Sequence, residues 1–441
     1  MTALESHREI KWISPGFWMV PSLILFAICV VFPPEKYTEY LGDRNYIFLN
    51  PRAVGFTLLC VASTLTGMAM FSWLFPLTNE SDSSQSRDIP QPGLTEFVLA
   101  SVLICGNLYV LRVLWQSGLL SSFLDTVRGH EQFGLHFEST ITTLDPANLS
   151  SISLASVAFL PWLYHVHLHA RDRLVPRDSL VLAVLFWGLF LTYAAAVAPL
   201  GRRNELMRPI LGIFLVWFLH RCLQGRMTRK LVLTMLSAFV GFGLSLFVLV
   251  WMGRSGGLSG PVDANELYTE TLGYCVAPYN QQAALIDGVL KFPGTGKGFN
   301  WCQWLWKFPV LQNFVDAQAI LGELPPYGVY ERLEALKANG FEPRYTALSA
   351  FGNSYVDFGW FGFLPFLLYG FVGAFTWRRF VQGEPAGLLL YPMFAYSILE
   401  WRANLLFPPR YMGQILIILA AVVIGRSVEQ ELRRKRSRPR D

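Results

Sequence analysis

The stretch Ala53–Phe75, AVGFTLLCVASTLTGMAMFSWLF, contains no charged residue. A helix of this length is about 35 Å long, which is enough to cross the ~30 Å of hydrocarbon in a bilayer. Because apolar stretches of similar length recur along the chain, the sequence predicts an all-α polytopic integral membrane protein with about ten transmembrane helices. The predicted spans are Ile13–Phe32, Ala53–Phe75, Glu96–Trp115, Ser150–His169, Ser179–Ala198, Met207–Leu223, Leu231–Met252, Phe358–Trp377, Ala386–Phe407 and Arg410–Gly425.

The composition agrees with this class and excludes others. Of 441 residues, 53% are hydrophobic and 15% are charged, and the mean hydropathy is +0.36. A soluble globular chain carries roughly 25% charged residues, so a cytosolic enzyme, a disordered scaffold and a nucleic-acid binder are excluded. The seven His and six Cys are too few for a metal-rich or disulfide-rich protein. We therefore expect no metal and no cofactor.

Basic residues predict the orientation of the spans. An even number of spans places both termini on one side of the membrane. If that side is the cytoplasm, 19 of the 36 basic residues lie inside and only ten lie in short outside loops. The chain then divides into residues 1–252 with seven spans, an outer loop at 253–357, three spans at 358–425 and a basic cytoplasmic tail at 426–441. We expect the tail to lie on the anionic inner leaflet.

The outer loop of about 105 residues is longer than a connection requires, which predicts a functional domain. Helices are predicted at Asn265–Leu290 and Gly328–Ala338, and the tract Pro293–Gly298 is rich in glycine. Cys275 and Cys302 are the two cysteines of the loop. A disulfide between them is chemically permitted in an oxidising compartment.

An aromatic cluster follows the glycine-rich tract and contains Trp301, Trp304 and Trp306. From the residues alone, such a cluster is typical of an aromatic belt that lies on the membrane surface.

Arginines are the most unusual feature of the predicted outer face, where the positive-inside rule disfavours them. The guanidinium group binds phosphate oxygens in a bidentate manner, so several arginines on one face suggest a site for a diphosphate headgroup. The alternative is that each side chain snorkels to lipid phosphates. The candidates are Arg202, Arg203 and Arg208 in one short loop, Arg254 before Gly256 and Gly257, Arg344 before the eighth span, and Arg402 and Arg410 beside the last turn.

Two carboxylates are candidates for a general base, because deprotonating a sugar hydroxyl requires a carboxylate or His within hydrogen-bond reach. Asp357 precedes a predicted span, where a helix N-cap is the alternative role. Glu400 lies in an apolar span and is therefore expected to be paired, either for function or in a purely structural ion pair with an arginine. His165, His167 and His169 fall at the inner end of a span, so we interpret them as interfacial residues and not as metal ligands.

The two stretches that border the outer loop resemble a known family. Arg254-Ser255-Gly256-Gly257 precedes the loop, and TALSAFGNSYVDFGWFG at Thr346–Gly362 follows it. Both resemble the Wzy-type polymerases of O-antigen and exopolysaccharide repeat units. In that family an Arg-x-Gly stretch precedes the large loop, and a T…G…Y-x-D-F-G-x-x-G stretch opens the next helix. The resemblance covers Leu231–Gly425, whereas the first half of the chain matches only in the number of spans.

The resemblance implies a metal-independent glycosyltransferase with a GT-C-like fold in the bacterial inner membrane. Such an enzyme transfers the growing glycan from its undecaprenyl-diphosphate carrier, a polyprenyl diphosphate, onto a new carrier-linked repeat unit at the periplasmic face. It usually works with a chain-length-determining co-polymerase. The resemblance assigns diphosphate binding to Arg254, Arg344, Arg402 and Arg410, with Arg202, Arg203 and Arg208 as a second cluster. It leaves Asp357 and Glu400 as alternative bases, with Tyr355, Trp301 and Trp304 as the glycan-binding residues.

Three other classes stay open at the level of sequence. An O-antigen ligase shares the large outer loop, but the loop here contains no His that could act as a base. A monosaccharide transferase has acidic residues after the first span, where Glu35, Glu39 and Asp43 lie. A flippase or transporter for lipid-linked oligosaccharides usually carries broken helices and midplane polar residues, which the predicted spans lack.

Overall fold

Most of the residues that the computed structural model describes are helical, and no strand occurs among them. This confirms the all-α architecture of a membrane protein that the apolar stretches predict. The described residues are 9–76, 93–127, 146–172, 176–200, 203–238, 241, 245, 264–291, 296–301, 316, 319–320, 322, 329–342, 348–403 and 409–437.

Six helices in this part are long and apolar enough to cross a membrane. They coincide with six of the predicted spans. They are Pro51–Leu74 (α5), Leu94–Gln116 (α6), Arg177–Val197 in α10 (Pro176–Val197), Glu205–Leu223 in α11 (Arg203–Leu223), Ala350–Val381, which combines α17 (Ala350–Phe358), η5 (Gly359–Gly362) and α18 (Phe363–Val381), and Met412–Leu432 in α20 (Pro409–Ser437).

The remaining predicted spans have three different outcomes. The first and ninth coincide with the shorter apolar helices α2 (Pro15–Val31) and α19 (Pro385–Leu399), which are about 25 and 22 Å long. The fourth lies in α9 (Pro146–Asp172), a long helix that is not among the six. The seventh, Leu231–Met252, lies largely outside the described residues.

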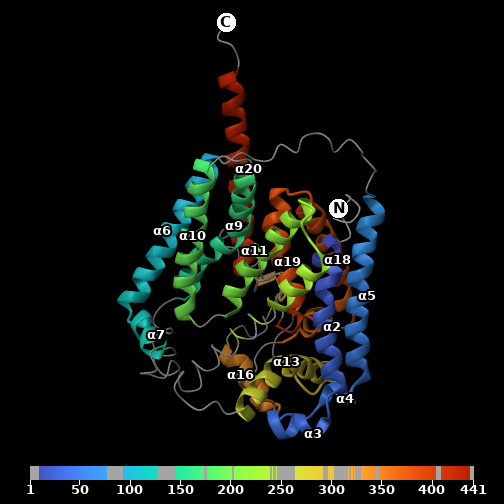
Figure 1. Cartoon of the computed structure of the whole chain (residues 1–441). Coiled ribbons are helices and arrows are strands. Elements are labelled where there is room, and N and C mark those ends of the chain that lie inside the picture. The colour runs from blue at the N-terminus through green and yellow to red at the C-terminus, as the bar shows by residue number, and fades with distance from the viewer. Residues whose placement is uncertain are drawn as a thin grey trace.

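Segments from several predicted outer connections gather at one end of the helix bundle (Figure 1). This end is called the α13 end, and the opposite end, from which α20 projects, is called the α20 end. The grouping agrees with the predicted alternation of the spans. The helices at the α13 end are α3 (Pro34–Lys36), α4 (Tyr46–Leu49), α7 (Leu119–Val127), α13 (Ala264–Ile286) and α16 (Val329–Ala338).

Helices α5 and α18 cross closely because glycines lie at their interface. A Cβ atom at Gly67 would collide with the carbonyl oxygen of Leu367, and one at Gly370 would collide with that of Thr64. Small residues permit such close approach between membrane helices, where dispersion contacts between backbones replace the hydrophobic driving force. This crossing fixes α18 and the preceding α17 against the first half of the chain.

Helix α13, although it belongs to the predicted outer loop, is integrated into the bundle by buried amides. Asn280 Oδ1 accepts a hydrogen bond from Tyr46 N at 2.7 Å, and Gln282 Nε2 donates to Thr57 Oγ1 at 2.7 Å. Gln282 Oε1 in turn accepts from the hydroxyl of Ser349, the N-cap of α17, at 2.6 Å. Because buried amides are costly unless paired, this network sets the register of α13 against α4, α5 and α17.

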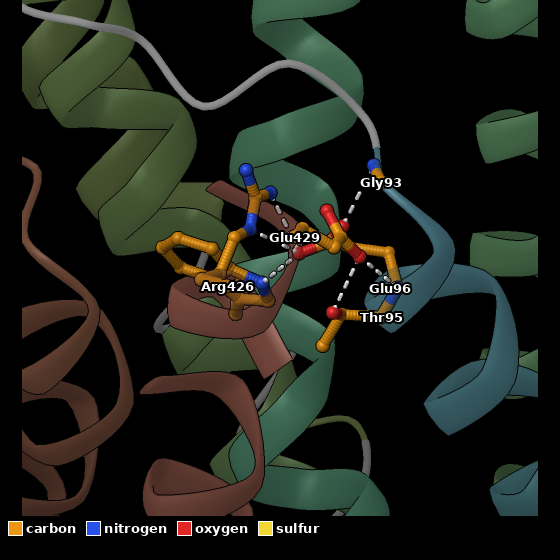
Figure 2. Close-up of polar contacts among 6 residues, drawn as sticks. Gly93, Thr95, Glu96, Arg426 and Glu429 are labelled. Atoms are coloured by element: carbon orange, nitrogen blue, oxygen red, sulfur yellow. Dashed lines mark hydrogen bonds and ion pairs between the residues drawn. The ribbon is translucent and has the colours of Figure 1, made fainter. Parts of the chain in front are cut away.

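A buried ion pair at the α20 end ties three helices together (Figure 2). Glu96 of α6 is fully buried, and its Oε1 accepts from Arg426 Nη2 of α20 at 2.6 Å and from Trp162 Nε1 of α9 at 3.0 Å. Its Oε2 accepts from Gly93 N at 2.9 Å, which caps α6. One turn further along α20, Glu429 accepts from Thr95 N at 2.6 Å.

Candidate functional site

Asp357 lies in the last turn of α17, and its position is fixed by the sequence around it. Ser349 begins the helix by accepting a hydrogen bond from Gly352 N at 2.9 Å. Gly359 ends it with a φ of 58°, a conformation that glycine adopts without strain. Asp357 is therefore not a helix N-cap, which was one of its two predicted roles. Its side chain is nearly buried, with 7% exposed.

The described part of the glycine-rich tract, with the residues that follow it, wraps around the Asp357 carboxylate. Asn300 Nδ2 donates to Oδ1 at 2.7 Å, and Trp301 N donates to Oδ2 at 2.9 Å. Gly296 lies so close to the Asp357 side chain and backbone that a Cβ atom there would collide with both. The segment Gly296–Trp301 is therefore held against α17 by its own backbone and by the carboxylate. The sequence shows no local signal for this contact, which joins residues that are 57 positions apart.

Glu400 and Arg402 form an ion pair in the turn after α19. Arg402 Nη2 lies 3.0 Å from Glu400 Oε2, and both side chains are mostly buried, with 18% and 14% exposed. Arg402 Nη1 also donates to the carbonyl oxygen of Tyr274 in α13 at 2.6 Å. The expectation that Glu400 is paired is confirmed. The pair also connects η6 (Trp401–Ala403) to α13.

Arg208 is a second largely buried arginine, and it packs against α19. The Arg208 guanidinium, carried by α11, lies over the Tyr396 ring of α19 at 5.2 Å from the centroid. Arg208 is only 4% exposed. A buried arginine in a candidate membrane span is a functional candidate, because charge at such a position is costly.

The carboxylate site and the arginine site belong to neighbouring elements. The Phe351 ring of α17 packs edge-on against Trp401 of η6, with centroids 5.3 Å apart. Trp401 and Phe351 are both fully buried. This aromatic contact places the helix that carries Asp357 directly against the turn that carries Arg402.

Two of the predicted glycan-binding side chains take part in packing. Trp301 is buried, and its ring contacts Phe366 at 5.3 Å and Tyr369 at 6.4 Å. Trp301 therefore belongs to the core. We do not propose that it stacks on sugar rings. Tyr355 is half-buried, and its ring meets Phe56 at 5.3 Å.

Several predicted residues fall beyond what the structure describes. Arg202, Arg254, Arg344 and Trp304 lie outside the described residues. For Arg203 and Arg410 the backbone is described, in the first turns of α11 and α20, but the side chain is not.

The predicted pairing of Cys275 with Cys302 also stays a prediction, because Cys302 lies outside the described residues. The structure does bring another thiol to Cys275, since Cys29 Sγ of α2 lies 3.8 Å from the Cys275 carbonyl oxygen.

The histidines form a second polar cluster toward the α20 end. The His169 ring lies 4.2 Å from His165 and 5.3 Å from His220, centroid to centroid. His220 Nε2 is 3.0 Å from Asp172 Oδ2, which also accepts from Gln224 Nε2 at 2.6 Å. In the described part of the chain, no group of three or more His, Cys, Asp or Glu side chains is arranged to hold a metal ion.

Comparison with protein-family models, with curated proteins and with solved structures found no match to the chain.

Proposed function

We propose that this chain polymerises oligosaccharide repeat units carried on polyprenyl diphosphate, in a GT-C-like membrane protein of about ten spans. The observation that carries the proposal is a pair of largely buried arginines, Arg208 over the Tyr396 ring of α19 and Arg402 in the turn that follows α19, where it pairs with Glu400. Two guanidinium groups in a largely buried environment suit a leaving group that carries several negative charges. The resemblance of Arg254–Gly257 and Thr346–Gly362 to Wzy-type polymerases supports the same reaction.

In the proposed reaction, the hydroxyl of a new repeat unit attacks the anomeric carbon of the growing glycan. The new glycosidic bond forms as the bond from that carbon to the carrier diphosphate breaks. The hydroxyl proton passes to a carboxylate, and the negative charge that develops on the diphosphate is stabilised by Arg208 and Arg402. The residues proposed for these steps need no metal.

We assign the base to Asp357 in preference to Glu400. The Glu400 carboxylate is already engaged in an ion pair with Arg402 at 3.0 Å. Asp357 accepts from the amide of Asn300 and from the backbone of Trp301, both of which are neutral donors. Its oxygens keep further lone pairs that can accept a substrate hydroxyl.

The test is polymerisation of a purified carrier-linked repeat unit by the protein in lipid vesicles, with glycan length as the readout. We expect Arg208→Ala and Arg402→Ala to lower the rate about 100-fold or more, as for the loss of other charge-stabilising groups. Arg379→Ala is the matched control, because Arg379 pairs with Glu384 at the exposed turn between α18 and α19. Wild-type chain lengths from both Arg208→Ala and Arg402→Ala would contradict the proposal.

The same vesicles separate the other classes of protein. Movement of the carrier-linked unit across the bilayer without bond formation would identify a flippase. Transfer onto a lipid A core, but not onto another repeat unit, would identify a ligase.

A further inference from the structure

Asp43, in the connection between α2 and α5, is a buried carboxylate with an incomplete set of partners. The side chain has no exposed surface. Its Oδ1 accepts from Glu342 N at 2.7 Å, whereas Oδ2 is buried without a hydrogen bond in the described part of the chain. A buried acid that lacks a cation is more stable when protonated.

The hydrogen bond from Glu342 joins two segments that are nearly 300 positions apart. Glu342 follows α16, and α17 with Asp357 begins eight residues later. Beside the bond, Phe341 and Leu336 pack with Ala284 and Leu290 in a small apolar cluster that is separate from the main core. The Phe341 ring also lies 5.6 Å from Tyr46. Residues 336–342 therefore dock onto the α13 segment through one small apolar cluster, and onto the α2–α5 connection through Tyr46 and the Asp43 carboxylate.

Among the described residues, the groups that face Asp43 do not neutralise its charge. From the segment after α16, the Glu342 carboxylate repels it, and from α13 the Asn280 amide lies beside it while donating to Arg44 O at 2.9 Å. The Arg44 guanidinium of its own connection lies over the Tyr46 ring at 5.8 Å. The other described carboxylates and amines on these elements are all exposed; they are Glu35, Lys36, Glu39, Asp287, Glu334 and Lys337.

We propose that Asp43 is a pH-sensitive latch, which holds residues 336–342 against the α2–α5 connection when it is protonated and weakens that docking when it is charged. The proposal is independent of the reaction proposed above. It predicts that the segment before α17 is held most firmly in acid and less firmly as the pH rises toward neutrality.

The direction of the effect follows from the pKa. Burial raises the pKa of Asp43 to about 6, from an ordinary value of 3.8. The hydrogen bond from Glu342 N opposes this increase, the Glu342 charge adds to it, and the Asn280 side chain opposes it. Because the docked state binds the proton more tightly, docking is strongest below pH 3.8 and weakens as pH rises through about 6. The full change in the docking equilibrium is on the order of 100-fold.

Hydrogen exchange of the peptide 334–342 in the full-length protein tests the latch. Wild type and Asp43→Asn are compared at each pH between 4 and 8, so that the intrinsic exchange rate cancels. We expect the wild-type rate to rise relative to Asp43→Asn, by up to about 100-fold, with a midpoint near pH 6. Asp287→Asn, at the exposed end of α13, is the control and should follow wild type.

A constant ratio of the two rates across this pH range would overturn the proposal. If Asp43→Asn does not fold, Glu342→Gln tests the same idea, because it removes a like charge and keeps the backbone N–H. The midpoint should then move to lower pH relative to wild type, and an unchanged midpoint would overturn the latch.

Discussion

Removing Glu96 should destabilise the protein far more than removing any surface carboxylate. The carboxylate is fully buried and accepts from Arg426, Trp162 and Gly93 N (Figure 2). In Glu96→Ala the Arg426 guanidinium, whose side chain is 14% exposed, loses its counter-charge in a nearly dry site. Trp162 Nε1 loses its acceptor at the same time.

The expected loss follows from these contacts. Breaking a buried ion pair by removing one partner costs about 3–5 kcal/mol. The loss of the cap at Gly93 N adds about 1 kcal/mol. The matched control is the exposed pair Arg379–Glu384, whose side chains are 43% and 38% exposed, and such pairs contribute roughly 0.2–1 kcal/mol. The loss of unfolding free energy in Glu96→Ala should therefore exceed the loss in Glu384→Ala by about 3 kcal/mol or more.

The assay is unfolding of the purified protein in mixed micelles as the fraction of SDS increases, followed by tryptophan fluorescence. The double variant Glu96→Ala/Arg426→Ala should lose less unfolding free energy than the two single variants lose in sum, because no unpaired charge is left in the site. If the losses of unfolding free energy in Glu96→Ala and Glu384→Ala differ by less than about 1 kcal/mol, the Glu96–Arg426 pair does not hold α6, α9 and α20 together as we infer.

Three further changes test other parts of the structure. Gly370→Val should collide with the Thr64 carbonyl and cost about 1–3 kcal/mol in the same SDS titration, whereas Gly55→Val, which meets no neighbouring atom, should not. Asp357→Asn should keep the fold but lower glycan polymerisation by about 100-fold or more, and unchanged activity would exclude Asp357 as the base. Lys297→Gly should stabilise the Gly296–Trp301 segment, by about 1 kcal/mol in a proteolysis assay, because Lys297 has a positive φ of 40°.

The membrane architecture could be predicted because its signal is local. Ala53–Phe75 was predicted as a span, and α5 occupies Pro51–Leu74. In a bilayer an apolar stretch without charge has few alternatives to a helix, since its backbone groups must be paired within the segment. Tertiary packing changes such helices little, so their limits can be predicted to within a few residues.

Helix ends with charged residues were harder to predict. The ninth span was predicted to reach Phe407, but α19 ends at Leu399, where Glu400 and Arg402 turn toward each other and toward α13. The tenth was predicted to end at Gly425, yet α20 continues to Ser437. Hydropathy marks where a segment leaves the hydrocarbon and not where its helix ends. The Glu and Arg residues that follow Gly425 have high helix propensity, which explains the continuation.

The candidate site could be predicted by residue type but not by partner. Asp357, Glu400 and Arg402 stand out in the sequence because charge is rare there. The contacts of Asp357 with Asn300 and of Arg402 with Tyr274 join segments that are 57 and 128 positions apart. No local pattern encodes such pairs, and Tyr396 resembles any other aromatic residue of an apolar helix.

The placement of buried charge in the bundle favours chemistry at one face over transport through the middle. Among the described residues, each buried Asp, Glu or Arg lies in a connection or within two turns of a helix end. They are Asp43, Glu96, Glu205, Arg208 and Asp357. A transporter usually gathers such groups at broken helices near the midplane. Here Glu96 fastens helices at the α20 end, whereas Arg208 lies over Tyr396 near the end of α19 and Asp357 is bound by the Gly296–Trp301 segment. A reaction at the α13 end would need charged residues at that end. It would need none along the transmembrane helices.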